Sequence, residues 1–444
     1  MKKHLNTRML SLVLAICMVL SLAAPVAAAP AGKVTYTKVS NNAVSADLLT
    51  KVGIDDLEMD THVDSDMVRV SIFLEEDSTI GAGFSTESIA ANSEAMAYRA
   101  ELKNVQAEIT AAIERKLGQK LDVVWNLTLA ANLISANVKY GQIKAIEQVA
   151  GVREVLIETP YEPDTAEQAD PNTVSSAAQI GSAAAWAYGY TGAGSRIAII
   201  DTGSDSDHQS LNAEAFEYAL SVLAQEKGMT YEEYVASLDL LDAEEIASVA
   251  DQLNAPVSAE AYINSKLPFG YNYIDKSLDI THDNDTQGSH GSHVAGIATA
   301  NSYIPTDDGF VKAIESALVQ GVAPEAQLIT MKVFGAKGGA YPSDYMVAIE
   351  DAIILGCDAA NLSLGSGNPG MSRETTAEYQ AILDSLTEAG IVVSMSAGNS
   401  GYWVENAYNA GFLYSDDVSM QTNGSPGSYT NSLTVASVDN DGTI

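Results

Sequence analysis

The sequence predicts an α/β protein, in which an open and mainly parallel sheet follows a smaller α+β domain. From residue 195 onward, short apolar strands alternate with helix-like stretches, as in an open parallel α/β sheet. Before it, residues 67–157 follow the order β-α-β-β-α-β, the split βαβ pattern of a ferredoxin-like domain. With 444 residues and 46% apolar content, the chain can bury the cores of two or three folded units.

The first 29 residues are predicted to be a secretory signal peptide. Three cations precede an apolar run and a small-residue cleavage site: Lys2, Lys3 and Arg8, then Met9 to Leu22, then Ala27 to Ala29. A membrane anchor is the alternative, but the apolar run is short for a span of about 20 residues. We therefore expect a protein that is secreted or held at the cell surface.

Charge and cysteine content limit the partners and the stabilising chemistry. Outside residues 1–29, which hold three cations and no acid, the formal charge is −38, so nucleic acid is not an expected partner. Cys17 lies in the predicted signal, which leaves Cys357 with no partner for an internal disulfide. Structural calcium fits such an acidic chain, but no ligands are identified. Residues 283–288 begin like an EF-hand, yet Val294 stands where the closing glutamate belongs.

The smaller domain is predicted at residues 66–160, after a polar segment at 30–65. Its strands are expected at 67–74, 121–129, 133–140 and 152–157, and its helices at 101–117 and 141–149. A polar linker at 161–178, with Pro163 and Pro171, separates it from the α/β domain at 179–444.

The α/β domain is predicted from buried strands that end in Gly-rich loops. Strands are expected at 196–200, 327–334, 359–364 and 390–396, and helices at 290–301, 343–355 and 375–389. One segment breaks the alternation, because residues 211–266 are acidic, Ala-rich and helix-prone. We interpret it as an inserted helical subdomain, for which the simplest interpretation is a surface decoration without a chemical role.

Asp201 ends the apolar strand RIAIID and precedes a Thr-Gly turn. An aspartate there often only caps the next turn. Asp-Thr-Gly also begins the active loop of pepsin-like proteases, which need two facing aspartates, whereas this chain has one such tripeptide. The motif alone therefore does not decide between these roles.

Two further segments carry candidate chemistry. His290 and His293 open a predicted helix, and at this spacing they indicate either a proton-transfer base or a pair of capping or metal-binding imidazoles. Zinc has no HExxH or cysteine cluster to support it. Asn399 follows an apolar strand, where its amide could donate to an oxyanion or simply form a turn.

Together the three segments resemble the subtilisin-like serine proteases, whose catalytic residues follow the order Asp, His, Ser. The resemblance covers about residue 180 to the end. It implies that Asp201 orients the histidine, that His290 is the general base and that Asn399 stabilises the oxyanion. It also implies the three-layer subtilisin-like fold, incomplete at its C-terminus, and a catalytic mechanism that needs no cofactor.

The family resemblance assigns a substrate strand and an inhibitor as well. Residues 361–365 (NLSLG) resemble the strand that pairs with extended protein or peptide substrates, with Ser363, Leu364 and Gly365 lining the pocket for the residue before the cut. The domain at 66–160 resembles the family's inhibitory propeptide. Within the family, the long Asp-to-His interval and the segment TVASVD resemble the lactocepin and C5a-peptidase type of cell-envelope proteinase, for which cell-wall attachment would lie further downstream.

The family's Gly-Thr-Ser-Met-Ala type of nucleophile segment is absent from residues 400–444. We expect that these residues come from a longer gene and that this chain alone hydrolyses no peptide, since an acyl-enzyme needs the serine oxygen. The alternative is a secreted pseudo-protease that binds peptides without cutting them.

Overall fold

Each element below belongs to the part of the computed structural model that can be described, residues 62–163, 173–257, 261–283, 288–336, 339–365, 379–384, 392–398, 424–429 and 433–436. The predicted signal peptide at 1–29 and nearly all of the polar segment at 30–65 lie outside these ranges. Among the described helices, none combines the length and the apolar character that crossing a membrane requires.

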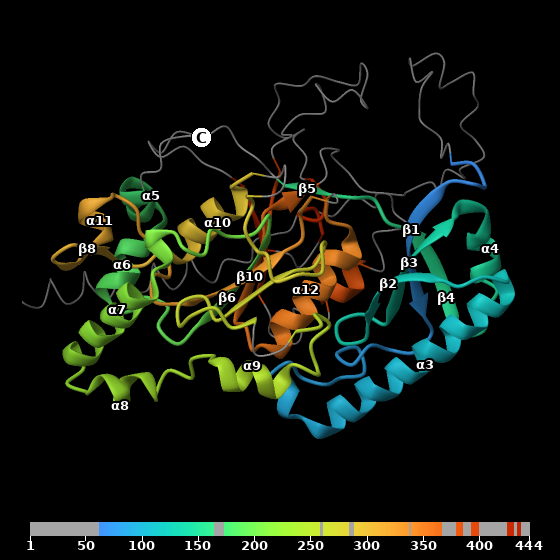
Figure 1. Ribbon diagram of the computed structural model, residues 1–444, viewed down its shortest axis with the longest axis horizontal. Helices are drawn as coiled ribbons and strands as arrows, with labels where there is room; N and C mark the ends of the chain where they lie inside the picture. The colour runs from blue at the N-terminus through green and yellow to red at the C-terminus, as the bar shows by residue number, and fades with distance from the viewer. Residues whose placement is uncertain are drawn as a thin grey trace, which may run out of the picture. The chain divides into compact units, whose positions relative to one another are not determined.

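The N-terminal domain has the predicted β-α-β-β-α-β order (Figure 1). Its elements are β1 (Met67–Leu74), α3 (Ser93–Leu117), β2 (Asp122–Leu127), β3 (Leu133–Lys139), α4 (Ile143–Ile146) and β4 (Val152–Ile157), with short 3-10 turns at Ile89–Ala91 and Tyr140–Gln142. The four strands form an antiparallel sheet in the order β2-β3-β1-β4. Helix α3 begins earlier than predicted, because Asn92 caps it by accepting hydrogen bonds from the backbone N–H groups of Glu94 and Ala95.

The second domain is built on a six-stranded sheet with the order β14-β13-β11-β6-β10-β7. Its strands are β6 (Arg196–Asp201), β7 (Phe269–Asn272), β10 (Gln327–Lys332), β11 (Ala359–Leu362), β13 (Val392–Ser396) and β14 (Leu433–Val435). Every neighbouring pair is parallel, as the alternation of strands and helices predicted. We refer to residues 196–435 as the sheet domain.

Helices cover both faces of this sheet. Because successive strand residues point to opposite faces, β6 shows which helix lies on which side. Ile199 belongs to the apolar cluster that contains Ala295 of α10 (His290–Thr299). Ala198 and Ile200 belong to the cluster that contains Val347 of α12 (Pro342–Ile354). The result is the three-layer α/β arrangement that the sequence predicted.

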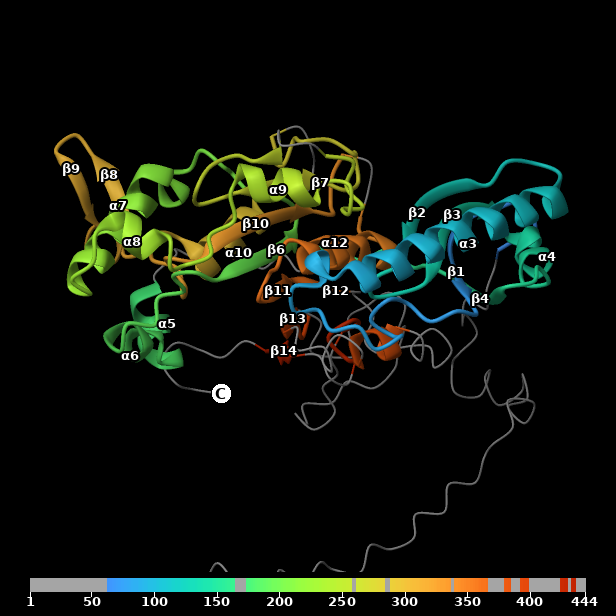
Figure 2. The same ribbon diagram turned by 90° about the horizontal axis from the view of Figure 1, so that it is seen from below.

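Helix α12 lies between the sheet and the N-terminal domain (Figure 2). All of its residues are buried, including those that a helix on a free surface would expose. Phe73, Trp125 and Leu129 of the N-terminal domain share one apolar cluster with α12. Burial of this apolar surface is the main force that holds the two domains together.

The region predicted as a helical insert, residues 211–266, does contain helices. They are α7 (Ala213–Glu226), α8 (Tyr231–Val235) and α9 (Ala243–Val249), preceded by a 3-10 turn at Gln209–Leu211. The side chains of Thr230 and Asp242 cap α8 and α9, in each case with a glutamate three residues later closing a capping box.

Several boundaries differ from the sequence predictions. The predicted linker at 161–178 contains β5 (Glu162–Pro163) and the start of α5 (Thr173–Ile180), which is followed by α6 (Ser182–Ala187). The predicted strand at 359–364 is interrupted at Ser363, with Leu364–Gly365 forming β12. Four short elements were not predicted, because four residues carry too little periodicity: β7, β8 (Tyr303–Thr306), β9 (Gly309–Lys312) and α11 (Ala313–Ser316). Of the predicted helix at 375–389, residues 379–384 are described and are helical.

Candidate active site

Two of the candidate catalytic residues meet at the carboxyl edge of the sheet. Asp201 is the last residue of β6, and His290 is the first residue of α10. The distance between Asp201 Oδ1 and His290 Nδ1 is 2.7 Å, a hydrogen bond. The Asp201 side chain is 1% exposed and the His290 side chain 13% exposed. The histidine is therefore held from the buried side and still reaches the surface.

The turn after β6 fixes the carboxylate. The backbone N–H of Thr202 donates to Asp201 Oδ1 at 2.6 Å, and the Thr202 hydroxyl accepts a hydrogen bond from the N–H of Gly291 at 2.8 Å. These bonds tie the strand-end turn to the first turn of α10. As a result, the aspartate and the histidine are positioned by two backbone turns that are bonded to each other.

Glycine is required at two places where these turns meet. Gly203 has φ +105°, and a Cβ atom there would lie 2.1 Å from the carbonyl oxygen of Ile280. A Cβ atom on Gly291 would lie 2.2 Å from the carbonyl oxygen of Gly203. Both distances are far below van der Waals contact, so the close approach of turn and helix depends on missing side chains.

Lys332 is a site neighbour that the sequence analysis missed. It pairs in register with Asp201 on the adjacent strand β10, and it is 1% exposed. Its Nζ atom donates a hydrogen bond to the carbonyl oxygen of Thr202 at 2.5 Å. The available signal was a lysine at the end of the apolar strand QLITMK, beside the strand that ends in Asp201.

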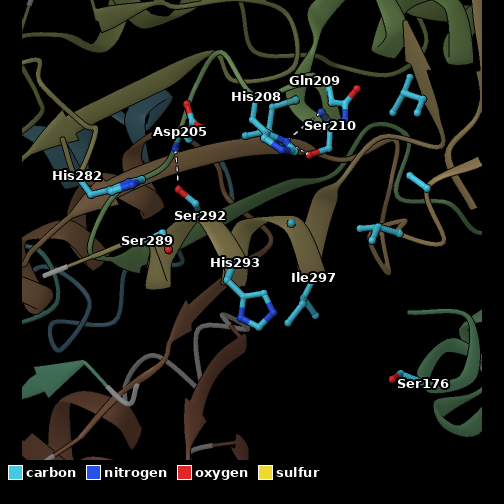
Figure 3. Close-up of a pocket in the computed structure, with 15 residues that line it drawn as sticks. Ser176, Asp205, His208, Gln209, Ser210, His282, Ser289, Ser292, His293 and Ile297 are labelled. Atoms are coloured by element: carbon cyan, nitrogen blue, oxygen red, sulfur yellow. Dashed lines mark hydrogen bonds between the residues drawn. The ribbon is translucent and has the colours of Figure 1, made fainter. Parts of the chain in front are cut away.

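His293 does not join the pair formed by Asp201 and His290. It lines a separate cavity of about 670 Å³, together with His208 and His282 (Figure 3). At its edge the backbone N–H of Asp205 donates to the Ser292 hydroxyl at 2.8 Å. Within the described ranges, no three His, Cys, Asp or Glu side chains are grouped so that they could hold a metal ion. Structural calcium therefore stays a prediction.

The candidate substrate strand is paired with a segment of the same chain. Leu364 and Gly365 form β12, which pairs antiparallel with β5, so that Leu364 faces Pro163 and Gly365 faces Glu162. Leu364 is fully buried, and its carbonyl oxygen accepts a hydrogen bond from the Ser396 hydroxyl at 3.1 Å. An extended segment that follows the N-terminal domain thus lies along the predicted substrate strand.

The remaining candidate residues are placed only in part. Ser363 precedes β12, and its hydroxyl accepts a hydrogen bond from the side-chain amide of Asn361 at 2.9 Å. Asn399, the predicted oxyanion donor, lies outside the described residues, directly after the segment 392–398. The geometry therefore brings Asp201 and His290 together, and it places Leu364 and Gly365 on β12 with Ser363 directly before them.

Known proteins resemble this chain over most of its length. The PI-type proteinase of Lactococcus lactis subsp. cremoris is 32% identical over 344 residues, which cover 76% of this chain and 16% of that protein. The PII-type proteinase of Lacticaseibacillus paracasei gives the same values. The minor extracellular protease Vpr of Bacillus subtilis (strain 168) is 26% identical over 381 residues, 82% of this chain and 37% of that protein. The chain thus spans about one sixth of the length of the two proteinases.

One solved structure among the similar ones is the epidermin leader peptide processing serine protease (EpiP) of Staphylococcus aureus. It is 17% identical, with a TM-score of 0.45, and covers 85% of this chain and 70% of its own.

A family model supports the same assignment as the sequence relatives. The model of the subtilase family matches residues 192–444, more than half of the chain. The match includes the whole six-stranded sheet and both residues of the hydrogen-bonded pair. The predicted resemblance to subtilisin-like proteases, and to the lactocepin type among them, is confirmed, and this chain belongs to the subtilase family.

Proposed function

We propose that this chain carries part of the catalytic domain of a serine endopeptidase that hydrolyses peptide bonds in proteins. The observation that carries the proposal is the 2.7 Å hydrogen bond between the buried Asp201 carboxylate and Nδ1 of His290. A carboxylate at Nδ1 holds the hydrogen on that nitrogen, so the lone pair of the neutral ring lies on Nε2. That lone pair is the group that takes a proton from a nucleophile hydroxyl.

Each remaining assignment has a defined chemical role in this proposal. Asp201 orients the imidazole and stabilises its protonated form during the reaction. The Asn399 side-chain amide would donate to the oxyanion of the tetrahedral intermediate. Residues 400–444 contain no Gly-Thr-Ser-Met-Ala type of segment, so we propose that residues 1–444 by themselves hydrolyse no peptide.

The N-terminal domain is proposed to act as an intramolecular inhibitor. Pairing of β5 with β12 is strand addition, the mode by which an extended peptide binds a sheet edge through its main chain. Ser363, Leu364 and Gly365 are the proposed substrate-binding residues. The segment at 162–163 pairs with β12 in the place that a substrate would take. Because both segments belong to one chain, a substrate must displace β5 in order to bind.

Export is part of the proposal. Residues 1–29 have the pattern of a cleavable signal peptide, and one relative is named an extracellular protease. We propose that the protein acts outside the cell or at its surface, with protein or peptide substrates and without nucleic acid partners.

Casein hydrolysis tests the catalytic assignment. The protein encoded by the complete reading frame is compared with residues 1–444. Both are also prepared as the Asp201→Asn variant and as the His290→Ala variant. We expect turnover only where the frame supplies a Gly-Thr-Ser segment, and we expect Asp201→Asn to lower it about 10⁴-fold. Turnover by residues 1–444 that His290→Ala abolishes would contradict the proposed inactivity of this chain.

The competing function, peptide binding without cleavage, predicts a different result. In that case the frame ends without a nucleophile segment, and labelled casein peptides bind residues 1–444 once β5 is released. Sequencing past codon 444 separates the two functions before any assay is run.

A further inference from the structure

The insert at residues 211–266 contacts the N-terminal domain as well as the sheet domain. After α9, residues Gln252–Ala255 form a segment that we call the arm. The arm is fixed to α12 by Asp351, whose carboxylate accepts hydrogen bonds from the backbone N–H groups of Asn254 at 2.7 Å and Ala255 at 2.9 Å. The Tyr273 hydroxyl donates to the same carboxylate at 2.9 Å. The arm is therefore held in one conformation on α12.

Arg99 of α3 reaches across the domain boundary to this arm. Although arginine is normally exposed, Arg99 is 2% exposed. Its Nη1 donates to the carbonyl oxygen of Gln252 at 2.5 Å, and its Nη2 donates to Oδ1 of Asn254 at 3.3 Å. Nη2 also lies 3.5 Å from Oε2 of Glu350 on α12. The guanidinium thus meets acceptors from both the arm and α12.

Glu350 connects the same three segments. Its Oε1 accepts hydrogen bonds from the backbone N–H groups of Leu129 at 2.7 Å and Ala130 at 2.8 Å, both in the N-terminal domain. Its Oε2 accepts one from the side-chain amide of Asn254 at 3.0 Å. One carboxylate therefore binds the N-terminal domain directly and also fixes the arm residue that receives Arg99.

The arm changes the energetics of burying Arg99. A guanidinium stays charged at all accessible pH values and has five N–H donors, so burying it is costly unless acceptors surround it. Helix α12 alone supplies Glu350, which is already engaged by the backbone N–H groups of residues 128–131 and by Asn254. The arm adds a main-chain and a side-chain oxygen in the directions that the planar guanidinium needs.

Apolar contacts accompany the polar ones. Leu253 is 7% exposed and Ala255 is fully buried, and both belong to the apolar cluster that contains Leu127 and Leu129 of the N-terminal domain. A charged socket surrounded by buried apolar side chains excludes water, which strengthens its electrostatic contacts.

We propose that the insert is a recognition element for the N-terminal domain of this chain, in which the arm and Glu350 form a socket for the Arg99 guanidinium. This inference rests on the proposed function, in which the N-terminal domain is an inhibitor bound to the sheet domain of the same chain. The insert is therefore more than the surface decoration that its composition suggested. An inhibitor domain without an arginine at this position is expected to bind weakly here.

Dissociation of the cut N-terminal domain tests the socket. A recognition sequence for a specific protease is placed within residues 164–172 of the full chain, the chain is cut, and the rate at which the N-terminal fragment separates is measured. Arg99→Met is expected to speed separation about a hundredfold, because it strips a buried charge pair of one partner. Asn254→Ala, on the sheet-domain side, is expected to speed it about tenfold through lost hydrogen bonds.

Two further variants are controls. Arg115→Met removes an exposed arginine from the same helix and is expected to change the rate by less than about twofold. Arg99→Lys keeps the charge without the planar fork, so its rate is expected to fall between those of the wild type and Arg99→Met. If Arg99→Met does not fold, Asn254→Ala decides the question, because it lies outside the N-terminal domain.

Two results would overturn the inference, and they differ. If the wild-type fragment stays bound and Asn254→Ala separates no faster than Arg115→Met, the arm plays no part in recognition, and the inhibitor proposal stands. If the wild-type fragment separates as soon as it is cut, the proposed inhibitor role fails together with the socket.

Discussion

Two regions of this molecule hold buried carboxylates whose partners differ. At the end of β6, Asp201 bonds to a histidine that reaches the surface. Along α12, Asp344, Glu350 and Asp351 accept hydrogen bonds from N–H or O–H groups of the N-terminal domain, the arm or Tyr273. Burial of an acid therefore does not mark a catalytic site by itself. The partner distinguishes the two regions, since an imidazole takes up and returns a proton near neutral pH.

The largest expected effect is at Glu350, on helix α12. Glu350→Leu leaves the backbone N–H groups of Leu129 and Ala130 without an acceptor and removes the carboxylate next to Arg99. We expect the free energy of unfolding to fall by about 3–5 kcal/mol, measured by urea denaturation of the full chain. Glu350→Gln keeps one acceptor oxygen and should lose less. A loss below about 1 kcal/mol for Glu350→Leu would mean that this buried carboxylate stabilises the fold no more than an exposed side chain does.

The same contrast explains what the sequence could predict. Asp201 and His290 lie at element ends that the apolar pattern marks, so their meeting at the carboxyl edge was foreseeable. Arg99 and Glu350 sit within helices far apart in the sequence, and a long-range buried ion pair leaves no periodic signal. Lys332 was missed for a related reason, because strand pairing alone brings it next to Asp201. The catalytic roles of Asp201, His290 and Asn399 stay predictions.

A pH measurement sharpens the contrast at Asp351. Burial raises the pKa of this carboxyl from 3.8 to about 6, against the opposing effect of hydrogen bonds from Asn254, Ala255 and Tyr273. Between these values the folded state binds more protons than the unfolded state, so the contribution of Asp351 to stability falls as the pH rises from about 4 to 6 and is then constant. The total change corresponds to about 3 kcal/mol.

Asp351→Asn removes this titration. The free energy of unfolding of the wild type, relative to the variant, is expected to fall by about 2.5 kcal/mol from pH 4 to pH 7, as measured by urea denaturation at each pH. Burial also raises the pKa values of Glu158, Glu325 and Asp344, but these groups are the same in both proteins and cancel in the difference. A difference that stays constant with pH would show that Asp351 is not the titrating group.

The smallest expected effect tests the Asp201 side. Gly291→Ala places a Cβ atom 2.2 Å from the carbonyl oxygen of Gly203 and 3.1 Å from Oδ1 of Asp201, whereas Gly296 of the same helix has no atom within 4 Å of the corresponding position. Gly291→Ala should therefore lower the free energy of unfolding by about 1–3 kcal/mol, and Gly296→Ala should raise it by about 0.5–1 kcal/mol. The low-field NMR signal of the His290 Nδ1 proton should weaken in the first variant and persist in the second. If both variants keep that signal, the hydrogen bond between Asp201 and His290 does not depend on the close approach of turn and helix, and the contacts of Asp201 with His290 and with the backbone N–H of Thr202 are enough to hold the pair.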